Sequence, residues 1–248
     1  MSNPLFSIIT ITYNAEKTLE KTIKSVVNQS YSGIEYIIID GASTDATLDI
    51  CDKYKSNIAK IISEKDSGIY DAMNKGLALA TGDYIWFINA GDTIYEYNTI
   101  SNFITGLKKY PDIIYGETSI INIDGEFLYM RRLKSPTSLT WKSFKNGMMV
   151  SHQAFIVKRE IAPKFNLKYK YSSDFDWCIK CMKKANIIYN TNIILANYLN
   201  EGTTTQNLKA SLKERFQIMS EYYGKIPTIL RHIKFAARFW VAKMKGKQ

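Results

Sequence analysis

Residues that could bind a ligand or take part in catalysis follow the apolar run in the stretch WFINAGD. Asn89, Gly91 and Asp92 come there after Ile88. A carboxylate at such a position can hold a hard divalent cation or accept a proton. Asn, Gly and Asp are also ordinary turn residues, so this stretch alone is equally compatible with a surface loop.

Similar polar groups follow earlier apolar runs in the chain. Thr12, Tyr13 and Asn14 end one run, Asp40 ends the next, and Asp66 lies shortly beyond a third. Each group alone is uninformative, because polar residues follow most strands. If the runs are neighbouring parallel strands, however, these groups meet at one edge of a sheet and form a single acidic, hydroxyl-bearing cleft.

The stretch SSDFDW carries two further carboxylates, Asp174 and Asp176, after Ser172 and Ser173 as candidate helix caps. A carboxylate beside a substrate hydroxyl can act as a general base. Two residues apart on a helix, the two acids point about 200° apart, so only one can face a common cleft. Either acid could instead serve only to stabilise the helix N-terminus.

The elements that must position these groups alternate between two hydrophobic periods. Runs rich in β-branched residues predict strands, and apolar residues at helical spacing predict the helices between them. The predicted strands are 6–12, 35–40, 58–63 and 84–88, and the predicted helices include 15–29, 69–80, 172–185 and 206–223. This alternation predicts an α/β fold with a mostly parallel central sheet and helices on both faces. Neither the dinucleotide-binding glycine pattern nor a P-loop occurs.

The composition favours an anionic partner, because the 248 residues carry a formal net charge of +10. Nucleic acid, a membrane surface or a phosphorylated substrate would each suit that charge, and a merely soluble basic surface is the alternative. Cys178 and Cys181 are spaced C-x-x-C, but no second pair follows, so core packing is the better interpretation. Free thiols and the lack of a signal peptide or bilayer-length apolar run favour the cytoplasm.

Taken together and in order, the motifs resemble the family 2 glycosyltransferases, nucleotide-sugar enzymes with the GT-A fold. The resemblance is carried by IITITYN, IIIDGASTDAT, EKDSGIYDAMNKGLALATGDYIWFINAGD and SSDFDW. It implies a GT-A-like domain over 1–205, with a nucleotide-binding half over about 1–95 and an acceptor half over about 96–205. C-terminal helices over 206–248 would follow it.

The resemblance assigns donor contacts to the ends of the predicted strands. It implies that Tyr13 stacks on the nucleotide base and that Asp40 accepts a hydrogen bond from the base. The other donor-binding residues that it implies are Thr12, Asn14, Asp66, Asn74 and Asn89.

Asp174 aligns with the aspartate of the family's later ED element, which implies that Asp174 is the catalytic base and Asp176 its competitor. His152, next to Gln153, and Trp177 are candidate contacts to the acceptor or donor sugar. A satisfied buried histidine and a core-packed tryptophan are the respective alternatives.

The metal motif of the family is usually D-x-D, and the aligned triplet here is Asn89-Ala90-Gly91, followed by Asp92. We expect Asp92 to be the sole protein carboxylate on a divalent cation, Mn²⁺ or Mg²⁺, with the donor diphosphate completing the shell. Met73 stands where the family often has Arg, and Lys75 is a candidate replacement for that charge.

These expectations describe an inverting glycosyltransferase that moves a sugar from a nucleotide-sugar donor to a saccharide or lipid-linked saccharide. Such an enzyme would act in bacterial surface polysaccharide synthesis, for example of capsule or lipopolysaccharide. The alternative is a catalytically degenerate nucleotide-sugar-binding protein or a nucleic-acid-binding protein. Nucleic acid is the less favoured partner, because the predicted cleft is acidic and no nucleic-acid motif occurs.

Residues 226–248 alternate apolar and basic side chains at helical spacing and contain no acid. This pattern is typical of an interfacial helix on an anionic membrane. A terminal helix docked on the enzyme itself is the alternative. The membrane interpretation places the protein in the cytoplasm, peripheral on the inner face of the cell membrane.

Overall fold

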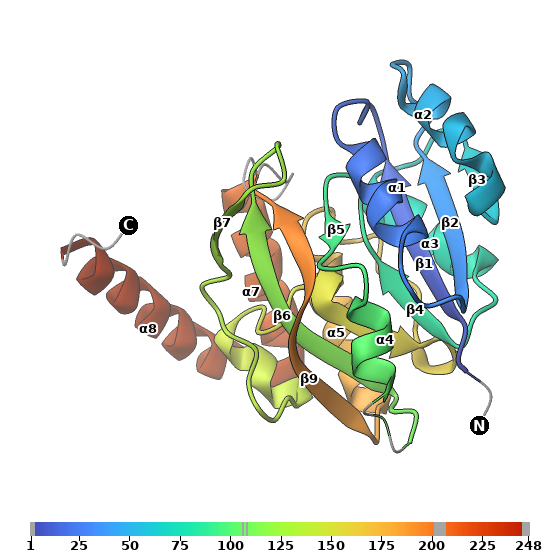
Figure 1. The fold of residues 1–248 in the computed structure, drawn as a ribbon. Coiled ribbons are helices and arrows are strands. Elements are labelled where there is room, and N and C mark those ends of the chain that lie inside the picture. Colours follow the sequence, from blue (N-terminus) through green and yellow to red (C-terminus); the bar gives the residue numbers. More distant parts are fainter. Residues whose placement is uncertain (1–2, 106, 108, 201–206, 245–248) are drawn as a thin grey trace.

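The computed structural model describes residues 3–105, 107, 109–200 and 207–244, with side chains in the last helix described to Phe235. A nine-stranded sheet forms its centre, in the order β3-β2-β1-β4-β8-β6-β9-β5, with β7 paired to β6 (Figure 1). The strands are β1 Phe6–Thr12, β2 Ile34–Asp40, β3 Lys60–Ser63, β4 Tyr84–Phe87, β5 Thr93–Ile94, β6 Ile113–Ile121, β7 Phe127–Met130, β8 Phe155–Lys158 and β9 Ile188–Leu199.

The helices are α1 Leu19–Val27, α2 Thr47–Lys53, α3 Ile69–Leu79, α4 Thr99–Thr105, α5 Ser173–Lys184, α7 Leu208–Tyr223 and α8 Lys225–Met244. Short 3₁₀ turns include η2 Trp141–Asn146 and η3 His152–Ala154. The elements predicted from hydrophobic period in the first half are confirmed, and so is the α/β fold class. The sheet is parallel from β3 to β4 and mixed beyond β4, where β8 runs antiparallel to both of its neighbours.

The register of the parallel strands aligns their carboxyl ends. Thr12 pairs with Asp40, and Asp40 pairs with Ser63. All seven side chains of β1 are buried, as expected for a strand that is covered on both faces. The polar residues that follow these strands therefore emerge at one edge of the sheet.

Helices cover both faces of the sheet, α1 and α4 on one side and α3 and α5 on the other (Figure 1). Gly76 of α3 lies so close to β1 that a Cβ atom would come within 2.5 Å of Cγ2 of Ile9. Trp177 of α5 stacks on Phe165 and meets Phe87 of β4 edge-to-face. These contacts hold α3 and α5 against the sheet.

The helix α7 packs against the start of α5 through polar contacts. The hydroxyls of Ser172 and Ser211 lie 2.9 Å apart, so Ser172 bonds to α7 instead of capping its own helix. The carboxylate of Glu214 accepts hydrogen bonds from the backbone N–H groups of Lys170 and Tyr171 at 2.8 and 2.9 Å. As a result, α7 determines the path of the chain that leads into α5.

The helix α8 leaves the body of the protein, as Figure 1 shows. Its inner face is held by buried Thr228 and by His232, whose ring meets Phe216 of α7. Within the part of the chain that the structure describes, no helix is both long and apolar enough to cross a membrane. Cys178 and Cys181 are fully buried in α5, which confirms the prediction of core packing.

Candidate active site

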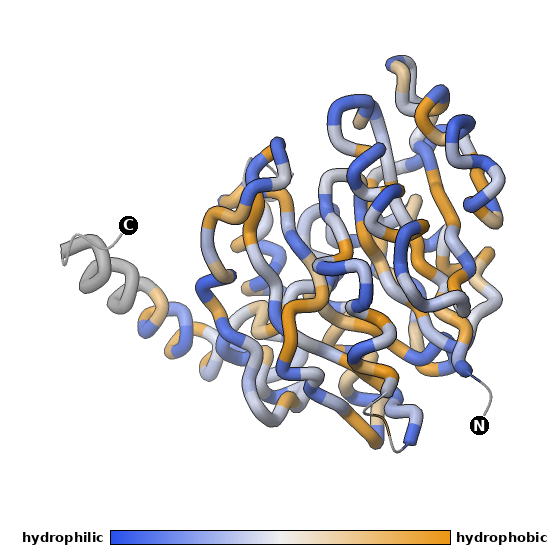
Figure 2. The backbone as a smooth tube through the Cα atoms, in the orientation of Figure 1, coloured by the Kyte–Doolittle hydropathy of each residue, from blue (hydrophilic) through white to orange (hydrophobic). Residues whose placement is uncertain are grey.

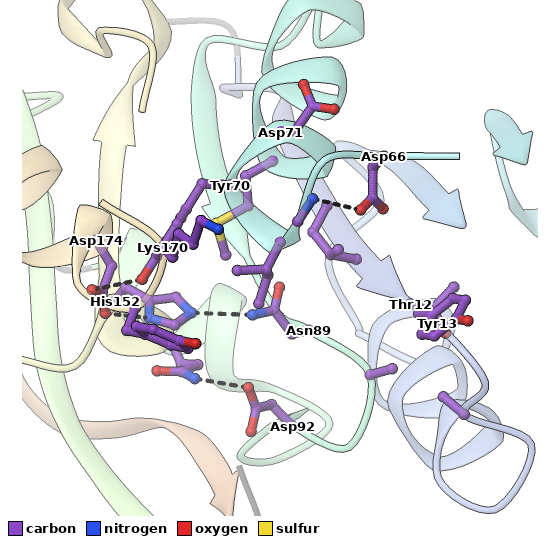
Figure 3. A pocket seen from close by; sticks show the side chains of 18 of the residues that line it. Thr12, Tyr13, Asp66, Tyr70, Asp71, Asn89, Asp92, His152, Lys170 and Asp174 are labelled. Carbon is purple, nitrogen blue, oxygen red and sulfur yellow. Dashed lines mark hydrogen bonds and ion pairs between the residues drawn. The ribbon is translucent and has the colours of Figure 1, made fainter. Parts of the chain in front are cut away.

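A cavity of about 890 Å³ opens at the carboxyl ends of β1 and β4. Its floor is formed by the ends of these strands, one wall by the start of α3, and the other by the segment before α5 and by η3 (Figure 3). The sequence-predicted residues on its wall are Thr12, Tyr13, Asp66, Asn89, Asp92, His152 and Asp174. The predicted convergence of polar groups at this edge is therefore confirmed for these side chains.

Tyr13 offers a flat apolar surface at the end of β1 that faces the β4 turn across the cavity (Figure 3). Its side chain is 63% exposed although it follows a fully buried strand. The chain beside it is crowded, because a Cβ at Gly41 would lie 2.7 Å from Oδ2 of Asp66 and 3.3 Å from the Tyr13 ring. The family element that resembles IIIDGASTDAT has a second acid where this chain has Gly41, and the glycine keeps this space open.

Asp40 does not line the cavity, so its predicted contact to the donor base stays a prediction without support from this geometry. The side chain is fully buried, and one oxygen accepts from the Ser43 N–H at 2.9 Å and from the Ser63 hydroxyl at 2.6 Å. The Ser43 hydroxyl bonds to the other oxygen. Because Ser43 of its own loop and Ser63 of β3 bond to its oxygens, the buried Asp40 supports the turn that follows β2.

Three further predicted contacts also lie off the cavity wall. Asn74 bonds through both amide atoms to the backbone of Phe165, at 2.7 and 3.0 Å. Trp177 is 1% exposed and donates to the carbonyl of Pro163 at 2.7 Å, so core packing is its role. Asn14 accepts the N–H of Thr44 at 2.9 Å and adopts a positive φ of 46° in the loop after β1.

Asp174 faces the cavity and is held on both oxygens (Figure 3). The hydroxyl of Tyr70 donates to Oδ1 at 3.0 Å, and Nδ1 of His152 lies 3.3 Å from Oδ2. An ionised carboxylate only accepts, so the His152 proton resides on Nδ1, and Nε2 accepts from the Asn89 amide at 3.3 Å. A continuous chain of hydrogen bonds thus links the β4 turn to α5.

The electrostatics keep Asp174 ionised. Burial opposes the charge, but the hydrogen bonds from His152 and Tyr70 and the positive charge of Arg215 together outweigh burial, so the pKa of Asp174 lies below its usual range. Burial and the Asp174 charge raise the pKa of Tyr70 well above its ordinary value, so Tyr70 remains a proton donor to Asp174. The site therefore contains a fixed, charged acceptor that is 16% exposed toward the cavity.

Asp176 points away from the cavity, as the helical geometry predicts. It is 3% exposed, accepts from the Tyr222 hydroxyl at 2.7 Å and pairs with Lys180 at 2.7 Å. Of the two candidate bases, only Asp174 can reach a substrate in the cavity.

The groups at the β4 turn do not fit the predicted metal site. Asp92 is 5% exposed, with Oδ2 accepting from Nε2 of Gln153 at 2.8 Å and Oδ1 from the Leu199 N–H at 3.1 Å. Burial raises its pKa to about 6, which disfavours the ionised form that a metal needs. Oδ1 of Asn89 is buried without a hydrogen-bond partner, but it is a single neutral ligand. Among the described residues, no group of three or more His, Cys, Asp or Glu side chains could hold a metal ion.

Lys75 does not supply the predicted replacement charge either. Its amine pairs with Glu64 at 2.9 Å and donates to the Lys65 carbonyl at 2.8 Å, away from the cavity wall. Tyr70 and Lys170 also line the cavity, although the sequence patterns did not predict them as site residues. Tyr70 follows the stretch Asp66-Ser67-Gly68 at the start of α3, and this position could have indicated a site residue. Lys170 lies in KYKYSS, where no pattern distinguishes it from its neighbours.

Known proteins are similar to this chain in sequence. The model of glycosyl transferase family 2 matches residues 7–165. A PGL/p-HBAD biosynthesis glycosyltransferase of Mycobacterium bovis is 31% identical over 208 residues, covering 80% of this chain and 78% of the relative. The putative teichuronic acid biosynthesis glycosyltransferase TuaG of Bacillus subtilis is 28% identical, covering 86% of each chain.

Solved structures show the same fold at low sequence identity. S. aureus TarS 1–349 in complex with UDP-GlcNAc superposes with a TM-score of 0.70 at 18% identity, covering 93% of this chain and 73% of that one. The mannosyltransferase PcManGT from Pyrobaculum calidifontis, in complex with GDP-Man and Mn²⁺, gives a TM-score of 0.63 at 15% identity, covering 96% and 76%. From its family match and its close relatives, this chain belongs to glycosyl transferase family 2.

Proposed function

We propose that the protein is an inverting glycosyltransferase that moves a sugar from a nucleotide-sugar donor to a hydroxyl of a saccharide or lipid-linked saccharide. The observation that carries this proposal is Asp174, a charged carboxylate held by Tyr70 and His152 on the same cavity as the ends of β1 and β4. This arrangement places one general base across the cavity from the strand ends at which the donor nucleotide would bind.

In the proposed reaction the donor nucleotide lies over the end of β1, with its base against Tyr13. The acceptor oxygen attacks the anomeric carbon, a new C–O bond forms, and the bond from that carbon to the diphosphate oxygen breaks. Asp174 takes the acceptor proton, and a nucleoside diphosphate leaves with the bonding electron pair. A single displacement inverts the anomeric configuration, and the site offers one base for it.

The names of the relatives support a role in the synthesis of a bacterial surface polysaccharide, since they include a PGL/p-HBAD biosynthesis glycosyltransferase and a putative teichuronic acid biosynthesis glycosyltransferase. The UDP-GlcNAc bound to TarS supports a nucleotide-sugar donor. We therefore place the acceptor among saccharide or lipid-linked precursors of the cell surface.

The test is a panel of UDP-, GDP-, dTDP- and CDP-sugars, with released nucleoside diphosphate as the readout, in the presence and absence of a bacterial lipid extract. We expect release above buffer with at least one donor, stimulated by the extract. A protein that binds a nucleoside diphosphate in a thermal-shift assay but turns over no donor would be a degenerate, binding-only member of the family. Stabilisation by single-stranded nucleic acid instead would contradict both versions.

We also propose that α8 lies on an anionic membrane at the cytoplasmic face of the cell. Large apolar side chains of this helix are exposed where a soluble helix would be polar: Ile226, Leu230 and Ile233 are 73%, 63% and 61% exposed. Figure 2 shows hydrophobic and hydrophilic residues alternating along the described start of α8. Lys225 and Lys234 are exposed beside them. An apolar stripe flanked by cations suits the boundary between acyl chains and anionic headgroups.

A further inference from the structure

The cavity presents an electrostatic problem for the proposed reaction. Its wall carries the carboxylates Asp66, Asp71, Asp92 and Asp174. A nucleotide-sugar donor brings a diphosphate, and the negative charge on the leaving oxygen grows as the glycosidic bond breaks. A cation must offset this charge, because unscreened like charges within a partly buried site oppose both binding and reaction.

A divalent cation is the usual solution in GT-A enzymes, but the β4 turn of this chain lacks the ligands for it. The position of the first acid of the motif holds the neutral Asn89, the next acid is replaced by Gly91, and both oxygens of Asp92 are bonded to protein donors. Hard cations of this type take several oxygen ligands, preferably carboxylates. The charge must therefore come from a side chain.

Most basic groups near the cavity have partners or lie off its wall. The charge of Arg215 acts on Asp174, but Arg215 is not on the cavity wall. Lys75 is paired with Glu64. The guanidinium of Arg131 donates to the backbone carbonyls of Leu133, Met148 and Met149. Both ring nitrogens of His152 are engaged within the chain of hydrogen bonds that ends at Asp174.

Lys170 is different. It is the only Lys or Arg on the cavity wall among the described residues, and within that part of the chain its amine has no ion pair or hydrogen bond. Figure 3 shows its side chain beside Asp174 and Tyr70. In the proposed reaction, the anomeric carbon lies at this end of the cavity, next to Asp174. Its backbone N–H is fixed at 2.8 Å by Glu214 of α7, so the base of the side chain is anchored while the amine stays available.

We infer that Lys170 neutralises the diphosphate of the donor and the nucleoside diphosphate leaving group, taking the place that a metal ion fills in other GT-A enzymes. This assignment rests on the proposed function, because it names the group that stabilises the leaving group of that reaction. An ammonium group acts here as a point charge that follows the phosphate through the displacement.

The test compares Lys170→Gln and Lys170→Arg with Lys168→Gln as a matched control. Lys168 lies two residues away, is 62% exposed, and pairs with Glu221 at 3.0 Å outside the cavity wall. Calorimetric titration in EDTA would measure affinity for UDP, GDP, dTDP and CDP and for the corresponding nucleosides. The nucleosides report on the Tyr13 end of the site alone.

We expect the wild-type protein to bind one nucleoside diphosphate in EDTA, and Lys170→Gln to weaken that binding about 10- to 100-fold while nucleoside affinity is unchanged. Lys170→Arg should retain most of the affinity, and Lys168→Gln all of it. Equal diphosphate affinity in Lys170→Gln and Lys168→Gln, or wild-type binding that requires added Mn²⁺ or Mg²⁺, would overturn the assignment and leave the proposed function standing. A wild-type protein that binds no nucleoside diphosphate with or without metal would overturn both.

Discussion

Replacing His152 tests how the candidate base is held. His152→Phe keeps an aromatic ring of similar size but removes the donor to Oδ2 of Asp174, which lies 3.3 Å away. Asp174 then retains the Tyr70 hydroxyl and its own helix N–H but loses the largest of the influences that favour its charge. Burial, which disfavours the charge, stays.

The magnitude follows from the value of one hydrogen bond to a charged group, about 1.5–3 kcal/mol. At about 1.4 kcal/mol for each pH unit, the pKa of Asp174 should rise by about 1 to 2 units. The wild-type pKa lies below its usual range because the ionised form is favoured, so the acid limb of activity should lie at low pH. In His152→Phe the acid limb of kcat/KM should move toward neutral pH by this amount.

The assay is the pH dependence of kcat/KM, with His152→Asn as the matched control. An asparagine amide can take the place of Nδ1 and donate to Oδ2, so His152→Asn should keep much of the acid limb at its wild-type position. A histidine that acts only as packing would lower activity at all pH values equally. An unshifted acid limb in His152→Phe would refute the reasoning.

The remaining predictions concern stability and membrane binding. Burial raises the pKa of Asp92 from 3.8 to about 6, so the protonated form stabilises the fold at low pH. This contribution, about 3 kcal/mol, is lost as the pH rises through about 6. Asp92→Asn should therefore flatten the pH dependence of the unfolding free energy between pH 4 and 7, and an unchanged profile would contradict the assignment. Gly76→Val should destabilise by about 1–3 kcal/mol or more in chemical denaturation, because its side chain would collide with Ile9. Ala78→Val, at an exposed position of the same helix, should cost less. The protein should lose its sedimentation with phosphatidylglycerol vesicles when residues 226–248 are removed, or when Ile229 and Ile233 are both replaced by Glu. Gln217→Glu on α7 should leave sedimentation unchanged. Retained sedimentation of the truncated protein would rule out α8 as the anchor.

The sequence predicted the parts of the site that depend on regular local structure. Hydrophobic period located β1 to β4, and the shared direction of parallel strands then placed Thr12, Asn89 and Asp92 at one edge. The angular separation on a helix correctly left only one of Asp174 and Asp176 facing the cleft. These inferences need only the geometry of a strand, a parallel sheet and a helix.

What the sequence could not show depends on side-chain partners that lie far apart in the chain. Asp40 and Asn74 have the residue types of ligand-binding groups, but nearby serines and the Phe165 backbone satisfy them. The link from His152 to Asp174 joins η3 to α5 and becomes visible only when both elements pack beside β4. Lys170 acquires its position from Glu214 of α7, a contact that no local pattern encodes.

The altered metal motif shows the same limit. Substituting Asn89 and Gly91 for acids signalled a change in the site, and Asp92 remained the natural candidate ligand. Its burial beneath Gln153 and the Leu199 backbone is a consequence of how β9 approaches the β4 turn, so the burial could not be read from the stretch itself. A retained acid need not keep the family's role.

The most direct test of the central claim compares Asp174→Asn with Asp176→Asn. Both changes conserve volume on the same helix, but only Asp174 faces the cavity. With a productive donor and acceptor, we expect Asp174→Asn to lower kcat by at least about 100-fold, the lower range of general-base contributions, with nucleoside diphosphate affinity unchanged. Asp176→Asn should turn over normally once its folding has been confirmed by circular dichroism. Near-normal transfer by Asp174→Asn would contradict the account.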